Sequence, residues 1–158
     1  LVGNLRPGKR LLLLSTGTGF APWGSVLRDP EIYDRFESVV AVEGCRKVAE
    51  LAFATEVVTD VRSHELLAEA AAAKLQYYAT VTREPYHHRG RIPDLVRSGK
   101  LFADLGLPRF DPATDRVMLC GNPQMLADMR ALMTEDGMIE GSSGEPGDFV
   151  IEKAFVER

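Results

Sequence analysis

Continuous apolar runs alternate with amphipathic segments along the whole chain. The runs that predict strands have little polar interruption and lie at 11–15, 38–42, 76–82, 116–120 and 149–156. The segments that predict helices carry apolar residues on one side and lie at 22–28, 48–61, 64–74, 92–98 and 123–135. Continuous apolar runs are typical of parallel strands buried on both faces. Strands that alternate with helices therefore predict an α/β fold, with a mostly parallel sheet covered by helices on both faces.

The first predicted strand runs directly into a glycine-containing turn, Ser15–Pro22. Glycines such as Gly17 and Gly19 allow a positive φ and a close approach of the backbone to a ligand. The following helix would start near Pro22, and its free N–H groups and positive dipole end suit a pyrophosphate. A tight strand–helix turn without a ligand is the alternative. The turn also lacks the lysine of an ATP phosphate-binding loop, which argues against a kinase or an ATPase.

Three arginines follow the second and third predicted strands, and they are candidates for binding a phosphate. These residues are Arg46, Arg83 and Arg91. In a parallel sheet the carboxyl ends of the strands meet at one edge, where ligands bind. The planar guanidinium suits a phosphate, so the three could converge on the 2′-phosphate that distinguishes NADP from NAD. Each arginine alone would be interpreted as a surface charge. Glu43 favours NAD instead, because an acid near the end of the second strand can hold a ribose 2′-hydroxyl in NAD enzymes.

Cys120 and Gly121 follow the fourth predicted strand, at the place where a nicotinamide would arrive in such a sheet. A small buried apolar residue is the alternative interpretation of this cysteine. No sequence signal indicates a lowered thiol pKa, so we do not interpret it as a nucleophile. The final predicted strand could carry Glu152 and Phe155 to the same edge, although an ordinary edge strand would show the same pattern.

Composition narrows the function classes. The 158 residues have a formal net charge of −4, which does not favour a nucleic-acid partner. Two cysteines are too few for a disulfide scaffold or a structural zinc site, and they fit a reducing cytoplasm. No cysteine or carboxylate pattern completes a metal set around His87 and His88, so we predict no metal site. No apolar run is long enough to span a membrane.

Six short segments occur in a fixed order and together are more specific than any of them alone. They are Gly17–Pro22 (Gly-Thr-Gly-Phe-Ala-Pro), Gly44–Arg46, Val81–Pro85, Gly90–Pro93, Cys120–Met125 and Glu152–Glu157. The chain carrying them resembles the NADP-binding domain of the bacterial ferredoxin/flavodoxin–NADP(+) reductases. The resemblance implies a Rossmann-like parallel five-stranded sheet. It also implies hydride transfer between NADP(H) and FAD, coupled to one-electron exchange with ferredoxin or flavodoxin.

The resemblance also assigns expected roles to individual residues. It implies cofactor binding by a set of residues at the strand ends: Gly17, Thr18, Gly19, Pro22, Arg46, Thr82, Arg83, Arg91, Gly121 and Phe155. Cys120, Glu152 and Ala154 match positions beside the nicotinamide and the flavin, and Ala154 would stack on the isoalloxazine.

The resemblance further predicts how the chain is divided. Residues 1–10 would be a linker from an upstream FAD-binding barrel, and residues 11–158 the NADP(H)-binding domain with a flavin-contacting tail. We expect this chain to bind nucleotide and to need the FAD domain for turnover. Two alternatives remain at this point: a non-catalytic nucleotide-binding module, and an NADH-dependent flavin or oxygenase reductase component.

Overall fold

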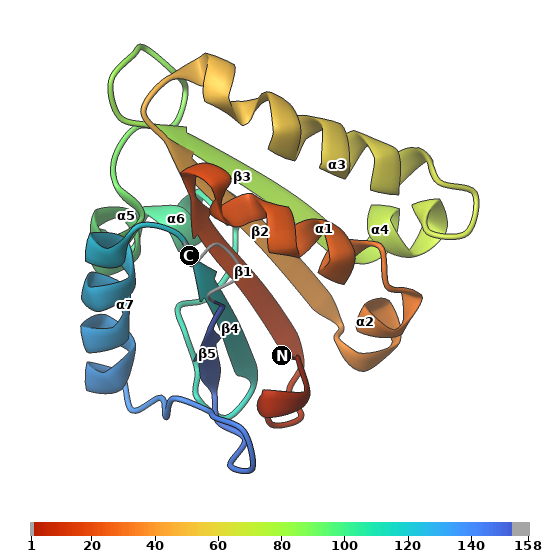
Figure 1. Ribbon diagram of the computed structural model, residues 1–158, viewed down its shortest axis with the longest axis vertical. Helices are drawn as coiled ribbons and strands as arrows, with labels where there is room; N and C mark the ends of the chain where they lie inside the picture. Colours follow the sequence, from red (N-terminus) through yellow and green to blue (C-terminus); the bar gives the residue numbers. More distant parts are fainter. Residues whose placement is uncertain (1, 153–158) are drawn as a thin grey trace, which may run out of the picture.

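Five parallel strands form one sheet in the order β3-β2-β1-β4-β5 (Figure 1). The strands are β1 (Arg10–Thr16), β2 (Ser38–Cys45), β3 (Leu75–Val81), β4 (Asp115–Cys120) and β5 (Phe149–Ile151). The structure is a computed structural model that describes residues 2–152. The predicted parallel five-stranded sheet is therefore confirmed.

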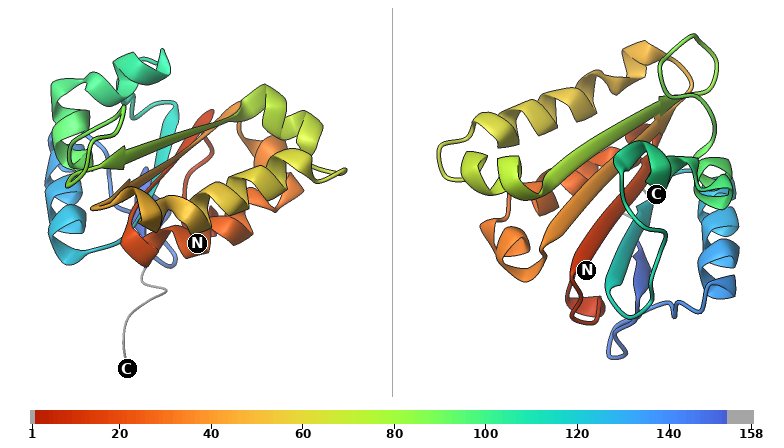
Figure 2. Two further views of the ribbon diagram at one scale, coloured as in Figure 1. Left: turned by 90° about the horizontal axis from the view of Figure 1, so that it is seen from above. Right: turned by 180° about the vertical axis from the view of Figure 1, so that it is seen from behind.

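Helices cover both faces of this sheet, as predicted (Figure 2). Those on one face are α1 (Ala21–Leu27), α2 (Pro30–Arg35), α3 (Ala52–Ser63) and α4 (Ala68–Lys74). Those on the other face are α5 (Ile92–Ser98), α6 (Lys100–Leu105) and α7 (Pro123–Glu135). Short 3₁₀ turns form η1 (Val2–Asn4), η2 (Gly17–Phe20) and η3 (Val48–Leu51).

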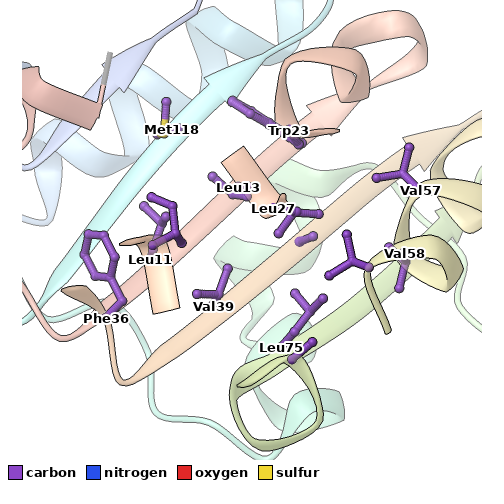
Figure 3. Close-up of a cluster of buried hydrophobic side chains, with 14 of the residues drawn as sticks. Leu11, Leu13, Trp23, Leu27, Phe36, Val39, Val57, Val58, Leu75 and Met118 are labelled. Atoms are coloured by element: carbon purple, nitrogen blue, oxygen red, sulfur yellow. The ribbon is translucent and has the colours of Figure 1, made fainter. Parts of the chain in front are cut away.

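The central strand β1 explains why its sequence is an uninterrupted apolar run. Side chains alternate across a strand, so Leu11 and Leu13 enter the core beneath α1–α4, which Figure 3 shows. Leu12 and Leu14 enter the second core, beneath α5–α7. All four leucines are fully buried, because helices cover the sheet on both sides.

Two short helices, α2 and α6, were not predicted from the sequence. Each has a recognisable signal: the Asp29 side chain accepts a hydrogen bond from the Glu31 N–H at the start of α2. Gly99, with φ of 84°, separates α5 from α6. Their six-residue lengths leave too little periodicity for a pattern to stand out.

The other differences concern the ends of predicted elements. The helix predicted over 48–61 begins as the 3₁₀ turn η3, and the one predicted over 64–74 begins only at Ala68. The last strand, predicted over 149–156, ends at Ile151. Residues 153–156 lie outside the described part of the chain.

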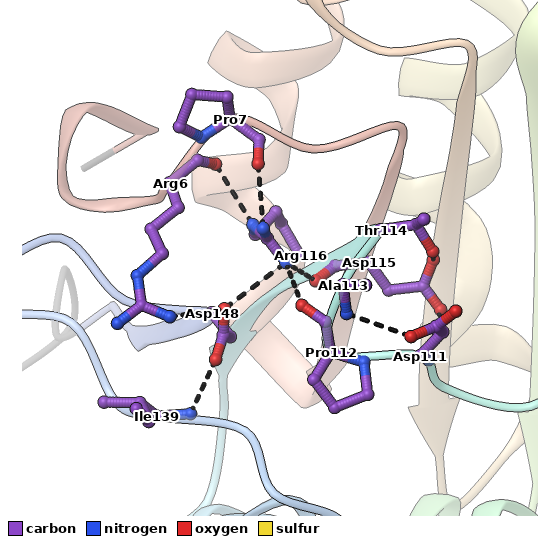
Figure 4. Close-up of polar contacts among 10 residues, drawn as sticks. All are labelled: Arg6, Pro7, Asp111, Pro112, Ala113, Thr114, Asp115, Arg116, Ile139 and Asp148. Atoms are coloured by element: carbon purple, nitrogen blue, oxygen red, sulfur yellow. Dashed lines mark hydrogen bonds and ion pairs between the residues drawn. The ribbon is translucent and has the colours of Figure 1, made fainter.

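The amino-terminal edge of the sheet is closed by buried ionic groups (Figure 4). The Arg116 guanidinium donates to the carbonyl oxygens of Arg6 and Pro7, and it lies 3.3 Å from the Asp148 carboxylate. Arg10 pairs in the same way with Asp115 and donates to the Pro108 carbonyl oxygen at 2.8 Å. These contacts tie the start of the chain and the loops before β4 and β5 to the sheet.

The strand order determines where a ligand can enter. From β1 the chain moves outward to β2 and β3, then crosses back to place β4 on the other side of β1. The turns after β1 and β4 therefore diverge to opposite faces. Such a switch point leaves a crevice at the carboxyl ends of the strands.

Candidate functional site

A cleft of about 1130 Å³ lies at the carboxyl-terminal edge of the sheet. It is lined by the turns that follow all five strands: Thr16, Gly17, Thr18, Gly19, Gly44, Cys45, Arg46, Glu50, Thr82, Arg83, Gly90, Arg91, Ile92, Pro93, Cys120, Gly121, Asn122, Pro123, Gln124, Met125, Leu126 and Glu152. Its position matches the switch point between β1 and β4.

The glycine turn after β1 is pressed against the turn after β4. A Cβ atom added to Gly19 would lie 2.5 Å from the Cys120 carbonyl oxygen, so only glycine fits without a shift of the backbone. Gly17 has a φ of 54°, which glycine adopts without strain. The Thr16 hydroxyl accepts a hydrogen bond from the Asn122 N–H at 2.9 Å and joins the two turns. The turn is therefore held in place through Thr16 and the buried Gly19, while Gly17 and Thr18 are exposed to the cleft.

A second helix start, that of α7, borders the same cleft. The Asn122 side chain caps it by accepting from the Met125 N–H at 2.8 Å, and Pro123 occupies the first turn. Asn122, Pro123 and Gln124 all line the cleft. The cleft therefore combines free backbone N–H groups with the positive end of a helix dipole, which favours an anionic ligand.

Arg46 and Arg83 lie side by side at one end of the cleft. The Arg83 N–H donates to the Arg46 carbonyl oxygen at 2.9 Å, and the Thr82 N–H donates to that of Cys45 at 3.0 Å. These bonds extend the pairing of β2 with β3 beyond the strand ends. Both arginine side chains are exposed, and within residues 2–152 neither guanidinium forms a hydrogen bond or an ion pair. The third predicted arginine, Arg91, also lines the cleft, but its guanidinium lies 3.4 Å from the Asp128 carboxylate.

Glu43 does not line the cleft, although it lies near the end of β2. Its carboxylate is buried beneath the sheet edge and accepts hydrogen bonds from the Ser15 hydroxyl at 2.7 Å and the Cys45 thiol at 3.2 Å. Burial raises the pKa of Glu43 to about 7, against the opposing effect of these two hydrogen bonds. Glu43, the acid that could bind a ribose hydroxyl in NAD enzymes, is therefore an interior residue in this fold.

Cys120 is buried at the end of β4, beside the cleft. Burial first, and then the negative charges of Glu152 and Glu43, raise the pKa of its thiol to about 11. The group therefore stays a neutral thiol at physiological pH, in agreement with the interpretation that it is not a nucleophile. Glu152 follows β5 on the same rim, where its N–H donates to the Leu119 carbonyl oxygen at 2.7 Å.

Most of the sequence-predicted site residues are brought together by the fold. Pro22 is the exception among the described ones: it lies in the first turn of α1 and does not line the cleft. Ala154 and Phe155 fall outside the described residues. The sequence reasoning missed Thr16 and Glu50 as lining residues, and it gave Asn122 and Gln124 no role of their own. The pair Asn122-Pro123 is a helix-start signal that the sequence shows directly. The contact of Thr16 with Asn122 arises only from the fold.

The histidine pair lies away from this cleft. His88 stacks on Tyr78 with ring centroids 4.0 Å apart, and its ring centroid is 4.6 Å from that of His87. In the part of the chain that the structure describes, no group of three or more His, Cys, Asp or Glu side chains converges as a metal site would. None of the helices described there is long and apolar enough to cross a membrane.

Comparison with known proteins agrees with this geometry. The model of the oxidoreductase NAD-binding domain family matches residues 13–131. Ferredoxin–NADP reductase A of Sorangium cellulosum is 54% identical over 98% of this chain and 56% of its own length. The ferredoxin–NADP reductase of Azotobacter vinelandii is 49% identical over the whole chain and 62% of its own length.

Among solved structures, a ferredoxin NADP+ reductase from Neisseria gonorrhoeae with bound FAD and NADP superimposes with a TM-score of 0.80. It is 28% identical over 96% of this chain and 58% of its own. The chain thus spans between 56% and 62% of the length of these relatives. The chain belongs to the oxidoreductase NAD-binding domain family, as the nucleotide-binding domain of the bacterial ferredoxin–NADP reductase type.

Proposed function

We propose that this chain is the part of a ferredoxin–NADP(+) reductase that binds NADP(H) and presents its nicotinamide to FAD. In the whole enzyme, hydride transfer between NADP(H) and FAD would be coupled to one-electron exchange with ferredoxin or flavodoxin. The observation that carries the choice of NADP is the pair Arg46 and Arg83. Two exposed arginines whose backbones are adjacent, and whose guanidinium groups have no partner in the described chain, fit a dianionic phosphate better than a neutral ribose.

The described residues fit the pyrophosphate as well as the 2′-phosphate. At Gly17 and Gly19 the backbone carries no Cβ, and the place a Cβ of Gly19 would take is already closed by Cys120. The open side at Gly17 lets a ligand approach the main chain closely, whereas the missing Cβ of Gly19 lets the turn pack against Cys120. We assign Gly17, Thr18 and Gly19 to the pyrophosphate. Pro22 then acts indirectly, by starting α1 behind the turn.

The rim of the cleft would hold the adenosine end. We assign Arg46, Thr82, Arg83 and Arg91 to the 2′-phospho-adenosine, because all four line the cleft in the turns that follow β2 and β3. Arg91 would have to exchange its contact with Asp128 for the phosphate. That ion pair is half-exposed and therefore weak, so the exchange costs little.

The opposite end of the cleft would hold the nicotinamide. When bound, NADP(H) supplies or accepts the hydride, and the protein supplies orientation. Cys120 and Gly121 would form the surface beneath the ring, because the neutral thiol offers an apolar contact. Glu152 would set the polarity on the side open to the flavin. Ala154 and Phe155 lie outside the described residues, and their contacts with FAD remain part of the proposal.

We further propose that an FAD-binding domain accompanies residues 11–158, with residues 1–10 as the connection. The relatives named as reductases are longer than this chain, and the gonococcal structure contains FAD besides NADP. The two buried free cysteines, Cys45 and Cys120, support a cytoplasmic location, where thiols stay reduced.

Calorimetric titration of the chain with NADP+ and with NAD+ tests the nucleotide assignment. We expect the double variant Arg46→Ala/Arg83→Ala to lose at least about tenfold in NADP+ affinity. This loss corresponds to the free energy of one charge-assisted hydrogen bond. NAD+ binding should stay unchanged. Arg97→Ala is the matched control, because Arg97 is exposed on α5 and does not line the cleft. Equal affinity of the unmodified chain for NAD+ and NADP+ would contradict the proposal and favour an NADH-dependent reductase component.

Reduction of a dye or of ferredoxin by NADPH tests the reductase assignment. We expect the 158-residue chain to be colourless and inactive, and a protein that joins it to an FAD-binding domain to be yellow and active. An FAD-free protein of full natural length would support the non-catalytic module instead.

A further inference from the structure

Two glutamates lie directly beside the arginine pair, and neither forms an ion pair with it. One Glu50 carboxylate oxygen accepts hydrogen bonds from the backbone N–H groups of Arg46 at 3.0 Å and Lys47 at 2.9 Å. One Glu84 carboxylate oxygen accepts from the Val48 N–H at 2.8 Å. Three consecutive N–H groups at the start of η3 are thus satisfied by two acids.

The presence of these acids is electrostatically unexpected. Glu50 itself lines the cleft, and its hydrogen bonds with Lys47 and Arg46 hold its pKa below the usual value, so it stays ionised. A negative charge beside a phosphate site opposes phosphate binding. An exposed glutamate close to an exposed arginine would also be expected to pair with it. Instead both carboxylates are bound to the backbone, and the guanidinium groups of Arg46 and Arg83 are left open to the cleft.

Glu84 also connects two segments that are far apart in the sequence. Segment 82–84 is joined to segment 45–48 by three hydrogen bonds from backbone N–H groups, besides a longer one of 3.4 Å from the Thr82 hydroxyl to the Cys45 carbonyl oxygen. The three run from the Thr82 N–H to Cys45, from the Arg83 N–H to Arg46, and from the Val48 N–H to the Glu84 carboxylate. Beyond Cys45, the last residue of β2, both segments lie past the strand ends, where a backbone is normally mobile. Contacts within the protein thus hold the backbones of Arg46 and Arg83 next to each other.

We propose that Glu50 and Glu84 are positioning residues that create selectivity for the 2′-phosphate of NADP by fixing the turns that carry Arg46 and Arg83. This proposal rests on the proposed NADP-binding function. Neither acid contacts the phosphate. Their effect arises because a ligand that meets two arginines already in place loses less conformational entropy on binding. The backbone N–H groups that donate to both carboxylates also offset part of their negative charge, which reduces their repulsion of the phosphate.

Substitutions at Glu50 separate positioning from charge. Glu50→Asp keeps the negative charge but shortens the side chain by one methylene, so it no longer reaches the Arg46 and Lys47 N–H groups. Glu50→Gln removes the charge but keeps a carbonyl oxygen at the same reach. If position matters, Glu50→Asp and Glu50→Ala lose affinity for NADP+, and Glu50→Gln retains it. If charge repulsion dominates, Glu50→Gln and Glu50→Ala bind NADP+ more tightly than the unmodified chain.

The experiment is a calorimetric titration of the full chain and its variants with NADP+ and NAD+. We expect Glu50→Ala, Glu50→Asp and Glu84→Ala each to raise the Kd for NADP+ about fivefold, the size of a typical coupling to one hydrogen-bonded group. The Kd for NAD+ should change less than about twofold, so the selectivity ratio falls. Glu84→Gln should behave like the unmodified chain. Glu56→Ala is the control for removal of a nearby charge, because Glu56 is exposed on α3 and does not line the cleft.

The outcomes separate this inference from the proposed function. Lack of NADP+ selectivity in the unmodified chain contradicts the function itself. Selectivity that persists in Glu50→Ala and Glu84→Ala overturns the positioning role alone. Thermal melting shows whether each variant is folded. Because Glu50→Asp keeps the charge and loses only the reach, its titration decides the question even if an alanine variant unfolds: unchanged NADP+ selectivity in Glu50→Asp overturns the inference.

Discussion

The two edges of the sheet use arginine in opposite ways. At the amino-terminal edge, Arg116 is 4% exposed and bonded through all three guanidinium nitrogens, to the carbonyls of Arg6, Pro7 and Pro112 among others (Figure 4). At the carboxyl-terminal edge, Arg46 and Arg83 are exposed, with no side-chain partner among residues 2–152. Nothing in the residue type distinguishes these roles.

Burial explains the difference. A guanidinium removed from water needs hydrogen-bond partners, and Arg116 has one for each of its three nitrogens. Such a group stabilises one arrangement of the chain and is closed to other ligands. A guanidinium left in water at a concave edge keeps its hydrogen-bonding capacity for a ligand. The amino-terminal edge therefore serves the fold, and the carboxyl-terminal edge can serve binding.

The largest expected effect comes from breaking the amino-terminal edge. Arg116→Ala leaves the buried Asp148 carboxylate with only the half-exposed Arg6 as a cationic partner, and removal of one member of a buried pair costs about 3–5 kcal/mol. Urea unfolding measures this free energy. Arg46→Ala in the same assay should stay within about 0.5 kcal/mol of the unmodified chain. Similar losses in the two variants would remove the distinction between the edges.

Glu43 tests whether burial or position along the strand decides the role of a charged group. It lies near the carboxyl-terminal edge, yet it is buried and its pKa is raised from 4.5 to about 7. Between these two values the folded chain holds a proton that the unfolded chain has lost, so stability falls as the pH rises. The penalty is complete above pH 7 and amounts to about 3 kcal/mol.

Glu43→Gln removes this titration. We expect the variant to gain up to about 3 kcal/mol at pH 8 and to match the unmodified chain near pH 4. The facing groups Cys45, Tyr77 and Cys120 do not titrate in this range, because burial raises the pKa of each. Urea unfolding as a function of pH gives the comparison. An unfolding free energy with the same pH profile in both proteins would show that Glu43 is not the responsible group.

Gly19 tests the junction of two turns inside the cleft. Gly19→Ala places a Cβ 2.5 Å from the Cys120 carbonyl oxygen, and the resulting shift should cost about 1–3 kcal/mol of stability. The same shift opens the turn, so NADP+ affinity should also fall, as calorimetry can measure. Gly3→Ala, at a position with no atom within 4 Å, is the control. Unchanged NADP+ affinity in a destabilised Gly19→Ala variant would argue against pyrophosphate binding at this turn.

The smallest expected effect is that of salt concentration on NADP+ affinity. It tests the difference between the two sheet edges without any substitution. Ionic screening acts on exposed charges far more than on buried ones. Raising the salt concentration from about 0.05 to 0.3 M should weaken NADP+ binding a few-fold and leave the melting temperature almost unchanged. A melting temperature that falls in parallel with affinity would mean that the amino-terminal edge is also open to solvent.

The fold was predictable to a large extent because its main signals are local. The apolar run 11–15 identifies a strand buried on both faces, and the boundaries of α5 and α7 match the predicted ones. Pro93 and Gly99 mark the limits of α5, and Asn122 and Pro123 mark the start of α7. Short helices such as α2 escaped prediction, because one and a half turns carry too little periodicity.

The candidate site was predictable as a set of positions but not as an arrangement. The glycine turn and the arginines could be recognised because turns after parallel strands share one edge. Glu43 shows the limit: near the end of β2 a single step along the chain reverses the direction of a side chain, so an acid can face the ligand or the core. The sequence carries no local sign of which occurs.

By itself the amino-acid sequence determined the α/β class, the order of the elements and the residues available for binding an anion. Periodicity and turn chemistry are properties of neighbouring residues, so they can be interpreted along the chain. Only the tertiary structure decided that Arg116 is closed while Arg46 is open, and that Glu84 binds the backbone of a distant segment. Those outcomes depend on burial and on contacts between residues 36 and 110 positions apart, which no local pattern encodes. The bond of Glu50 to the start of η3 is different, because it is a capping box within four residues of the chain.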